Sequence, residues 1–102
     1  MEDKHFKFKG DSTDLMHIVL KLPWTHPHMV IGPHPPWKTK CFSIQVVSKL
    51  GSILKTEHAL ELLDLGLNDE AEEVRIETII SMPVIVLCYG LGLLAEMFKR
   101  LE

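Results

Sequence analysis

The stretch ALELLDLGLNDEAEEVRIETIISMPVI, residues 59–85, decides the fold class of this chain. It begins with a leucine-rich segment whose apolar residues recur at the spacing of one helical face. A short polar turn follows at Asn68 and Asp69, and the acidic residues just after the turn suit the positive end of a second helix. The pattern predicts two antiparallel helices joined by that turn.

Three residues in this stretch make the pattern more specific than a simple pair of helices. Asp69 can accept hydrogen bonds from free backbone N–H groups at the start of the second helix. Val74 is then expected to lie in the core between the helices, and Arg75 to reach a carboxylate or carbonyl of an adjacent repeat. This arrangement is typical of HEAT-type repeats, which stack hairpins on one another.

Any two amphipathic helices joined by an Asp-capped turn would share part of this pattern. The repeat interpretation is favoured because apolar residues cover more than one stripe of the second helix, and a helix that is apolar on most sides is buried on most sides. These residues are Ile76, Ile79, Ile80, Val84, Ile85, Val86 and Leu87. We therefore predict an all-α fold of antiparallel helical hairpins of the HEAT-type α-solenoid class.

The remaining sequence extends this prediction outward from residues 59–85. Residues 1–10 read as a flexible tail, and residues 11–102 as the HEAT-like repeat fragment. Five prolines between Pro23 and Trp37 predict a Pro/His-rich loop at 23–37, with Pro23 ending the helix before it. Helices are expected at 12–22, 38–50, 56–66 and 69–88, with Pro83 as a kink and a last helix from about 92, and no strand is expected.

Composition places the chain among ordinary globular domains. Its 102 residues suffice for one small domain, and 46% of them are apolar and 25% charged. The net charge is −3 and the basic residues are scattered, so we expect no nucleic-acid binding. The two cysteines, Cys41 and Cys88, lie far apart, which favours a reducing compartment over a disulfide-bonded secreted fold. Residues 1–20 lack the apolar run of a secretory signal.

Several motifs together resemble the helical-repeat region of the ATR checkpoint kinases. They are Asp14-Leu15-Met16, Leu22-Pro23-Trp24, Lys40-Cys41-Phe42, and Asn68 to Leu87 with its Glu73-Val74-Arg75. The resemblance covers most of the chain after the first ten residues. It implies part of a very large nuclear serine/threonine kinase of DNA-damage signalling, taken from the α-solenoid far from the catalytic end. The Pro/His-rich stretch departs from the animal members, so a plant member is favoured.

The resemblance implies a scaffold that binds protein, with the ATR-interacting protein as a partner beside the neighbouring repeats. It transfers no catalytic residue. Gly90-Leu91-Gly92 lacks the third glycine of a kinase phosphate-binding loop, and Asp-Phe-Gly does not occur. We therefore expect a non-catalytic segment without a cofactor or a small-molecule substrate.

A small membrane-associated helical protein is the alternative interpretation. Residues 78–95 contain no charged residue over 18 positions, the lower limit for a membrane-spanning helix. Pro83, Gly90 and Gly92 interrupt this segment, and acidic residues precede it, so burial by protein rather than by lipid is favoured and no membrane contact is expected.

Metal binding and nucleophilic catalysis have weaker support. His26, His28, His34 and Cys41 carry the donor atoms that zinc prefers, but their spacings match no common zinc motif, and a solvated polar loop is favoured. Cys41 and His58 could form a nucleophile and base only if the fold brought them together, which nothing in the sequence indicates. Cys88, inside an apolar run, is expected to be a small buried residue.

Overall fold

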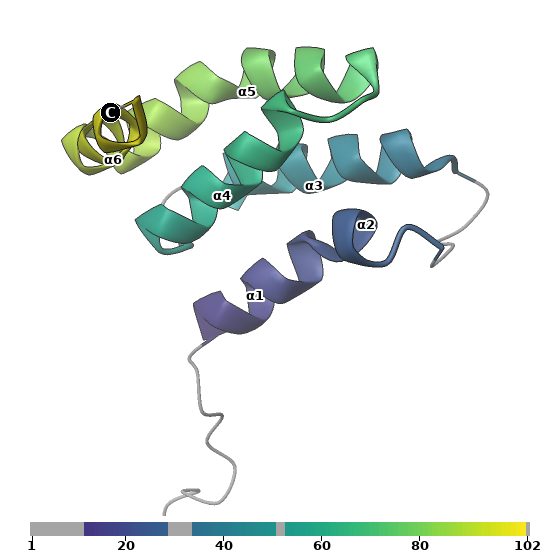
Figure 1. Cartoon of the computed structure of the whole chain (residues 1–102). Helices are drawn as coiled ribbons and strands as arrows, with labels where there is room; N and C mark the ends of the chain where they lie inside the picture. The colour runs from purple at the N-terminus through teal and green to yellow at the C-terminus, as the bar shows by residue number, and fades with distance from the viewer. Residues whose placement is uncertain (1–11, 29–33, 51–52, 102) are drawn as a thin grey trace, which may run out of the picture.

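The computed structural model describes residues 12–28, 34–50 and 53–101, and every regular element within these ranges is a helix (Figure 1). The predicted all-α fold class is thereby confirmed for the described part of the chain. The elements are α1 (Ser12–Leu20), α2 (Leu22–Thr25), α3 (Pro36–Leu50), α4 (Thr56–Leu67), α5 (Glu72–Tyr89) and α6 (Leu91–Leu101). The expected tail at 1–10 lies outside the described residues.

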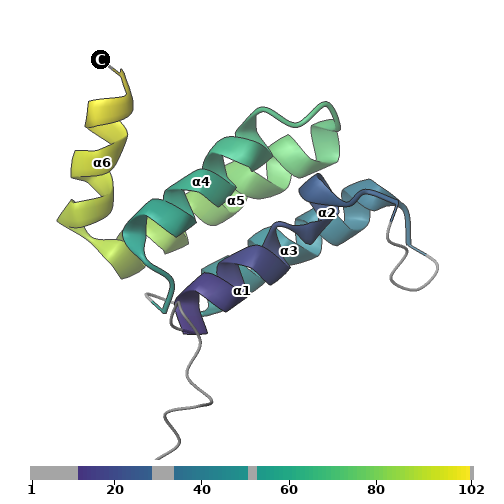
Figure 2. The ribbon, with the colours of Figure 1, turned by 60° about the horizontal axis from the view of Figure 1, so that its bottom comes forward.

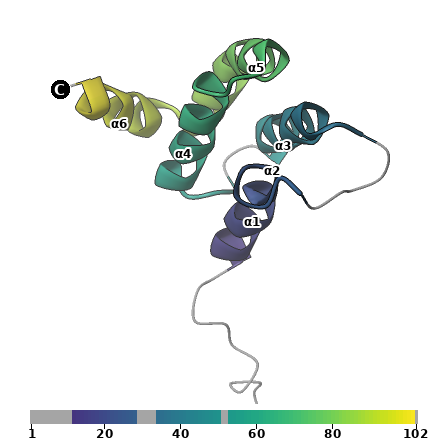
Figure 3. The same cartoon turned by 45° about the vertical axis from the view of Figure 1, so that its right-hand side comes forward.

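The helices form two layers. In one layer α3 packs along α5, and in the other α1 and α6 pack against α4. Figure 2 shows α1 and α4 running in one direction and α3 and α5 in the opposite direction, and Figure 3 shows the layers nearly end-on. The hairpin of α4 and α5 thus repeats the orientation of the hairpin of α1 and α3. This arrangement is compatible with an α-solenoid.

The core lies where α3, α4 and α5 meet. The apolar residues of α4 recur three and four positions apart, so they share one side of the helix and are almost fully buried. The principal core residues from these helices and their neighbours are Leu20, Ile44, Val47, Leu60, Leu62, Leu63, Val74, Ile85 and Leu93. The core of the described chain is thus built largely from α3, α4 and the inner side of α5.

Pro23 does not end a helix as expected. It lies at the start of the short helix α2, where a proline is tolerated because the first backbone N–H groups of a helix have no intrahelical partner. At the other side of the predicted loop, α3 already begins at Pro36. Both ends of the 23–37 stretch are therefore helical, and the residues between 29 and 33 lie outside the described residues.

The apolar segment 78–95 is divided between two helices. α5 continues through Pro83 to Tyr89, and Gly90 then adopts a φ of 67°, a left-handed conformation that glycine tolerates best. α6 begins at Leu91 and leaves in a different direction (Figure 2). Within the described ranges, no helix is long and apolar enough to cross a membrane.

Candidate functional site

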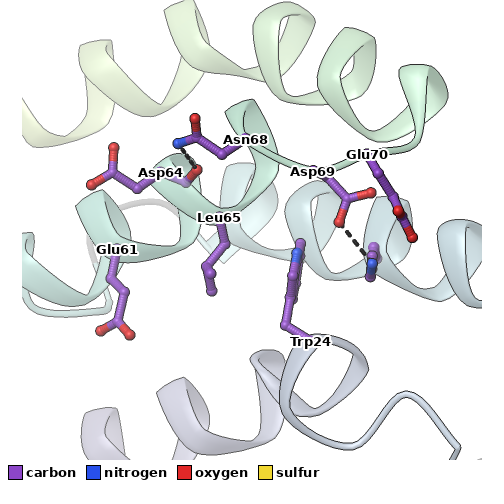
Figure 4. A pocket seen from close by; sticks show the side chains of 8 residues that line it. Trp24, Glu61, Asp64, Leu65, Asn68, Asp69 and Glu70 are labelled. Atoms are coloured by element: carbon purple, nitrogen blue, oxygen red, sulfur yellow. Dashed lines mark hydrogen bonds and ion pairs between the residues drawn. The ribbon is translucent and has the colours of Figure 1, made fainter.

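Asp69 holds the turn between α4 and α5 and links it to the preceding hairpin. Its Oδ2 accepts a hydrogen bond from the backbone N–H of Ala71 at 2.9 Å. Its Oδ1 accepts one from Nζ of Lys40, on α3, at 2.7 Å (Figure 4). α5 begins at Glu72, later than predicted, and Ala71 precedes its first residue. Asp69 therefore stabilises the turn rather than the first helical N–H groups.

The Asp69 carboxylate is ionised at neutral pH. Burial acts to raise its pKa, but the hydrogen bonds from Lys40 and from the Ala71 N–H outweigh burial and hold the pKa below its ordinary value of 3.8. The Lys40 and Asp69 side chains are only 15% and 4% exposed, so water screens this ion pair less than a surface pair. The contact is a charge-assisted hydrogen bond between two hairpins.

Arg75 makes hydrogen bonds within its own chain, at the turn that precedes α5. Its Nη1 donates to the backbone oxygen of Asp69 at 2.8 Å and to that of Glu70 at 3.1 Å. The guanidinium folds back because these carbonyls lie just before the helix start, within reach of a long side chain in the first turns of α5. Val74 is fully buried. The repeat-signature role of Asp69, Val74 and Arg75 remains a prediction.

A pocket of about 580 Å³ lies beside this turn. Residues of α2, α3, α4 and the α4–α5 turn line it, and Figure 4 labels all of them except Lys40. The lining residues are Trp24, Lys40, Glu61, Asp64, Leu65, Asn68, Asp69 and Glu70. Most of its carboxylates already have a cationic partner: Glu61 pairs with Lys21, and Asp64 with Arg100. The pocket is a polar groove with largely balanced charge, and its lining combines no nucleophile with a base.

The outer side of α5 is apolar and exposed. We name this surface the α5 face; it comprises Ile76, Ile79, Ile80, Val84 and Leu87. Ile80 is 64% exposed and Leu87 is 83% exposed, whereas Ile85 on the inner side is 1% exposed. The face points away from α3 and α4 because the inner side of α5 is occupied by its contacts with these two helices. An apolar stripe with little cover is typical of a surface that contacts other protein.

A second apolar surface lies at the opposite end of the stack. It is formed by the outer sides of α1 and α3, and we name it the α1–α3 face: Leu15, Ile18, Val19, Phe42 and Val46. Val19, Phe42 and Val46 line a groove of about 210 Å³ between the two helices. The described residues therefore present an exposed apolar surface at each end of the stacked hairpins.

The candidate zinc ligands are not brought together by the structure. His26, His28 and His34 are exposed, with the His26 ring beside Thr25 and the His34 ring against Phe42. Cys41 is buried. Among all the residues that the structure describes, no group of three or more side chains is placed to hold a metal ion.

Cys41 and His58 have separate partners. The Cys41 thiol donates a weak hydrogen bond to the backbone oxygen of Glu73 at 3.6 Å, and burial together with nearby carboxylates raises its pKa. His58 stacks on His17 instead. A raised thiol pKa opposes nucleophilic chemistry at neutral pH.

Cys88 is exposed, and the expectation that it is buried is wrong. It lies next to Leu87 on the part of α5 that nothing in the described chain covers. An apolar run around a cysteine shows that the segment packs against something, but the run does not show whether the covering partner belongs to the same chain. The sequence carried no signal for the side of α5 that is left open.

Comparison with known proteins shows an ATR-like sequence. The chain is 37% identical to the serine/threonine-protein kinase ATR of Arabidopsis thaliana over 102 residues, which cover 98% of this chain and 4% of that protein. It is 38% identical over 65 residues to the ATR proteins of Oryza sativa subsp. indica and subsp. japonica, with 64% of this chain and 2% of each relative covered. No protein-family profile matches the chain. No solved structure matches it.

The resemblance to ATR kinases drawn from the sequence motifs is confirmed by these matches, and the relatives are plant proteins, as expected. The chain spans only a few hundredths of their length. The relatives are named serine/threonine kinases, and the matched region is short.

Proposed function

We propose that this ATR-like chain is a non-catalytic helical-repeat segment that serves as a scaffold, with protein bound at the ends of its stacked hairpins. The observation that carries the proposal is the α5 face, where Ile80 and Leu87 remain mostly exposed although Ile85, on the inner side of the same helix, is almost fully buried. Leaving such side chains in water forgoes about 1.5–3 kcal/mol each, which a covering partner would recover.

The contact between the two described hairpins supports the proposal, because a further repeat could attach through an equivalent contact. Lys40, near the start of α3, donates to Asp69 in the turn of the following hairpin. Arg75 lies near the start of α5, the helix that occupies the corresponding place in the second hairpin. A following hairpin with a carboxylate in its turn would find Arg75 there, with its other guanidinium nitrogens as donors. This arrangement supports the HEAT-type interpretation.

The resemblance to ATR supplies the biological setting of the proposal. The chain would act within a nuclear checkpoint kinase of DNA-damage signalling, with neighbouring repeats and the ATR-interacting protein as its protein partners. A net charge of −3 with scattered basic residues favours protein over nucleic acid as the ligand.

Binding to a neighbouring repeat tests the proposal. The purified chain is titrated with the segment that follows the matched region in the Arabidopsis relative, and affinity is measured by calorimetry. Saturable binding is expected, and Ile80→Asp should weaken it by about tenfold or more, because a charge placed in an apolar contact costs at least 1.4 kcal/mol. The matched control is Ile53→Asp, since Ile53 is 53% exposed and lies outside the α5 face.

Absence of binding, or equal effects of the Ile80 and Ile53 substitutions, would contradict the proposal. The same two variants, titrated with the purified ATR-interacting protein, show whether this partner uses the α5 face. A partner that binds through this face should discriminate between them in the same way.

A further inference from the structure

A reciprocal set of four titratable side chains lies between α1 and α4, outside the turn and the apolar faces. The His17 and His58 rings stack with centroids 3.9 Å apart and planes 3° from parallel. His17 Nε2 lies 3.1 Å from Glu61 Oε1, and His58 Nε2 lies 3.4 Å from Asp14 Oδ1. Each helix thus supplies one histidine and one carboxylate, and each histidine faces the carboxylate of the other helix.

Lysines already balance the two carboxylates. Lys21, just after α1, lies 2.9 Å from Glu61, and Lys55, just before α4, lies 3.4 Å from Asp14. With neutral imidazoles, the two carboxylates and these two ammonium groups together carry zero net charge. A proton on either ring therefore adds a net positive charge to this contact between α1 and α4, which we call the seam. Within the seam His17 is 7% exposed and the His58 side chain 15% exposed.

The stacked geometry opposes a positive charge on both rings at once. His58 Nε2 faces Asp14, and His58 Nδ1 is buried with no hydrogen-bond partner among the described residues. Two charged rings 3.9 Å apart would also repel each other directly. The pKa of His17 lies below its ordinary value of 6.5, through burial first and then the charge of His58, with the carboxylate of Glu61 acting against them.

We propose that the stacked His17–His58 pair is a proton-sensitive latch that joins the first hairpin to the second and releases α1 from α4 in mild acid. The contact surface of α1 is small, because the helix packs mainly on α4 and on α2, and Leu15, Ile18 and Val19 on its outer side are exposed. Release would withdraw Leu20 from the core, but it leaves in place the more extensive packing of α3 and α4 on α5. Opening α1 would enlarge the α1–α3 face, so acid would change the surface that this end of the stack offers to a partner.

The direction of the pH effect follows from the linkage between protonation and opening. A histidine whose pKa is lower in the closed state binds protons more readily after opening, so closure is favoured above the open-state pKa and is lost as pH falls through the closed-state pKa. Each pKa unit by which the closed state lowers the pKa of a histidine changes the opening equilibrium by about tenfold. Opening should therefore increase between about pH 7 and about pH 5.

The test follows backbone amide signals of the full chain by NMR from about pH 7.5 to about pH 5. Amides of α1 should lose protection by about tenfold or more relative to those of α5, after correction for intrinsic exchange rates. In His58→Gln, which removes the ring that stacks on His17, α1 should stay protected at the lower pH. His28→Gln is the matched control, because His28 is exposed and outside the seam, and it should behave as the wild type.

Equal protection of α1 and α5 across this range would overturn the latch, and so would a pH response that His58→Gln leaves unchanged. If His58→Gln fails to fold, the wild-type measurement still decides, because the proposal requires α1 to open while α5 stays closed. The outcome is independent of whether the α5 face binds a neighbouring repeat.

Discussion

Gly66 of α4 and Thr78 of α5 meet so closely that a Cβ atom on Gly66 would overlap Thr78 Oγ1. Thr78 is fully buried, and its hydroxyl donates to the backbone oxygen of Val74, so it cannot move aside cheaply. The helix predicted at 56–66 continues past Gly66 to Leu67, with Asn68 as its C-cap. The glycine is required by the close approach of two helices rather than by the end of one.

We expect Gly66→Ala to destabilise the chain by about 1–3 kcal/mol, the usual cost of overpacking a core. Gly92→Ala is the matched control, because nothing lies within 4 Å of a Cβ at that helical position. Alanine there should be neutral or stabilising by up to about 1 kcal/mol. Urea denaturation of both variants measures the difference, and an equal effect of the two would contradict the close contact.

Lys40→Met should cost more stability than Lys55→Met. The first substitution leaves the buried carboxylate of Asp69 without its cation, whereas the Lys55–Asp14 pair is 42% and 35% exposed. Exposed pairs contribute about 0–1 kcal/mol, and removal of one partner from a more buried pair costs more. Chemical denaturation at neutral pH checks the order, and a larger loss for Lys55→Met would contradict it.

The stabilising effect of ionised Asp69 should disappear in acid. Because the folded-state pKa lies below the ordinary value of 3.8, this contribution is fully present above that value and is lost as pH falls through the folded-state pKa. Asp69→Asn keeps an acceptor for the Ala71 N–H but removes the charge. The stability difference between wild type and Asp69→Asn should therefore be largest near neutral pH and shrink below about pH 4. A constant difference would mean that the charge contributes nothing.

Arg75→Ala should reduce stability by about 1 kcal/mol in this chain, because the guanidinium donates to two backbone carbonyls of the turn. If Arg75 had no partner within the chain, its removal would be expected to have almost no effect on stability. Arg100→Ala is the comparison, since the Arg100–Asp64 pair is 47% exposed on both sides and should contribute only a few tenths of a kcal/mol. Thermal unfolding of the two variants measures both losses. A loss for Arg75→Ala no larger than that for Arg100→Ala would show that Arg75 does not stabilise the turn.

The sequence predicts local structure well wherever periodicity and turn residues agree. The helices at 38–50 and 56–66 correspond closely to α3 and α4, and the turn at Asp69 is present. The start of α5 was placed too early because Asp69 bonds within the turn and not to the helix. Pro23 was misplaced because a proline that breaks one helix also fits the first turn of another.

Contacts between distant segments were beyond the reach of the sequence. His17 and His58 belong to different hairpins, and nothing local to either residue indicates that their rings stack. The exposure of Cys88 and Leu87 was equally hidden, because an apolar helix does not show which of its sides is covered by its own chain. The Lys40–Asp69 contact depends on the packing of α3 against the next hairpin, which only the tertiary structure defines.

The central claim is that the chain folds without using its α5 face, which is left for other protein. The most direct test is the free energy of unfolding, in urea, of the double variant Ile80→Gln, Leu87→Gln, with Ile85→Ala as the buried reference. The double variant should stay within about 0.5 kcal/mol of wild type, because both side chains are exposed and glutamine is a good helix former. Ile85→Ala, at a position 1% exposed, should cost about 2–5 kcal/mol. A loss in the double variant as large as that of Ile85→Ala would show that the face belongs to the chain's own core, and would contradict the account.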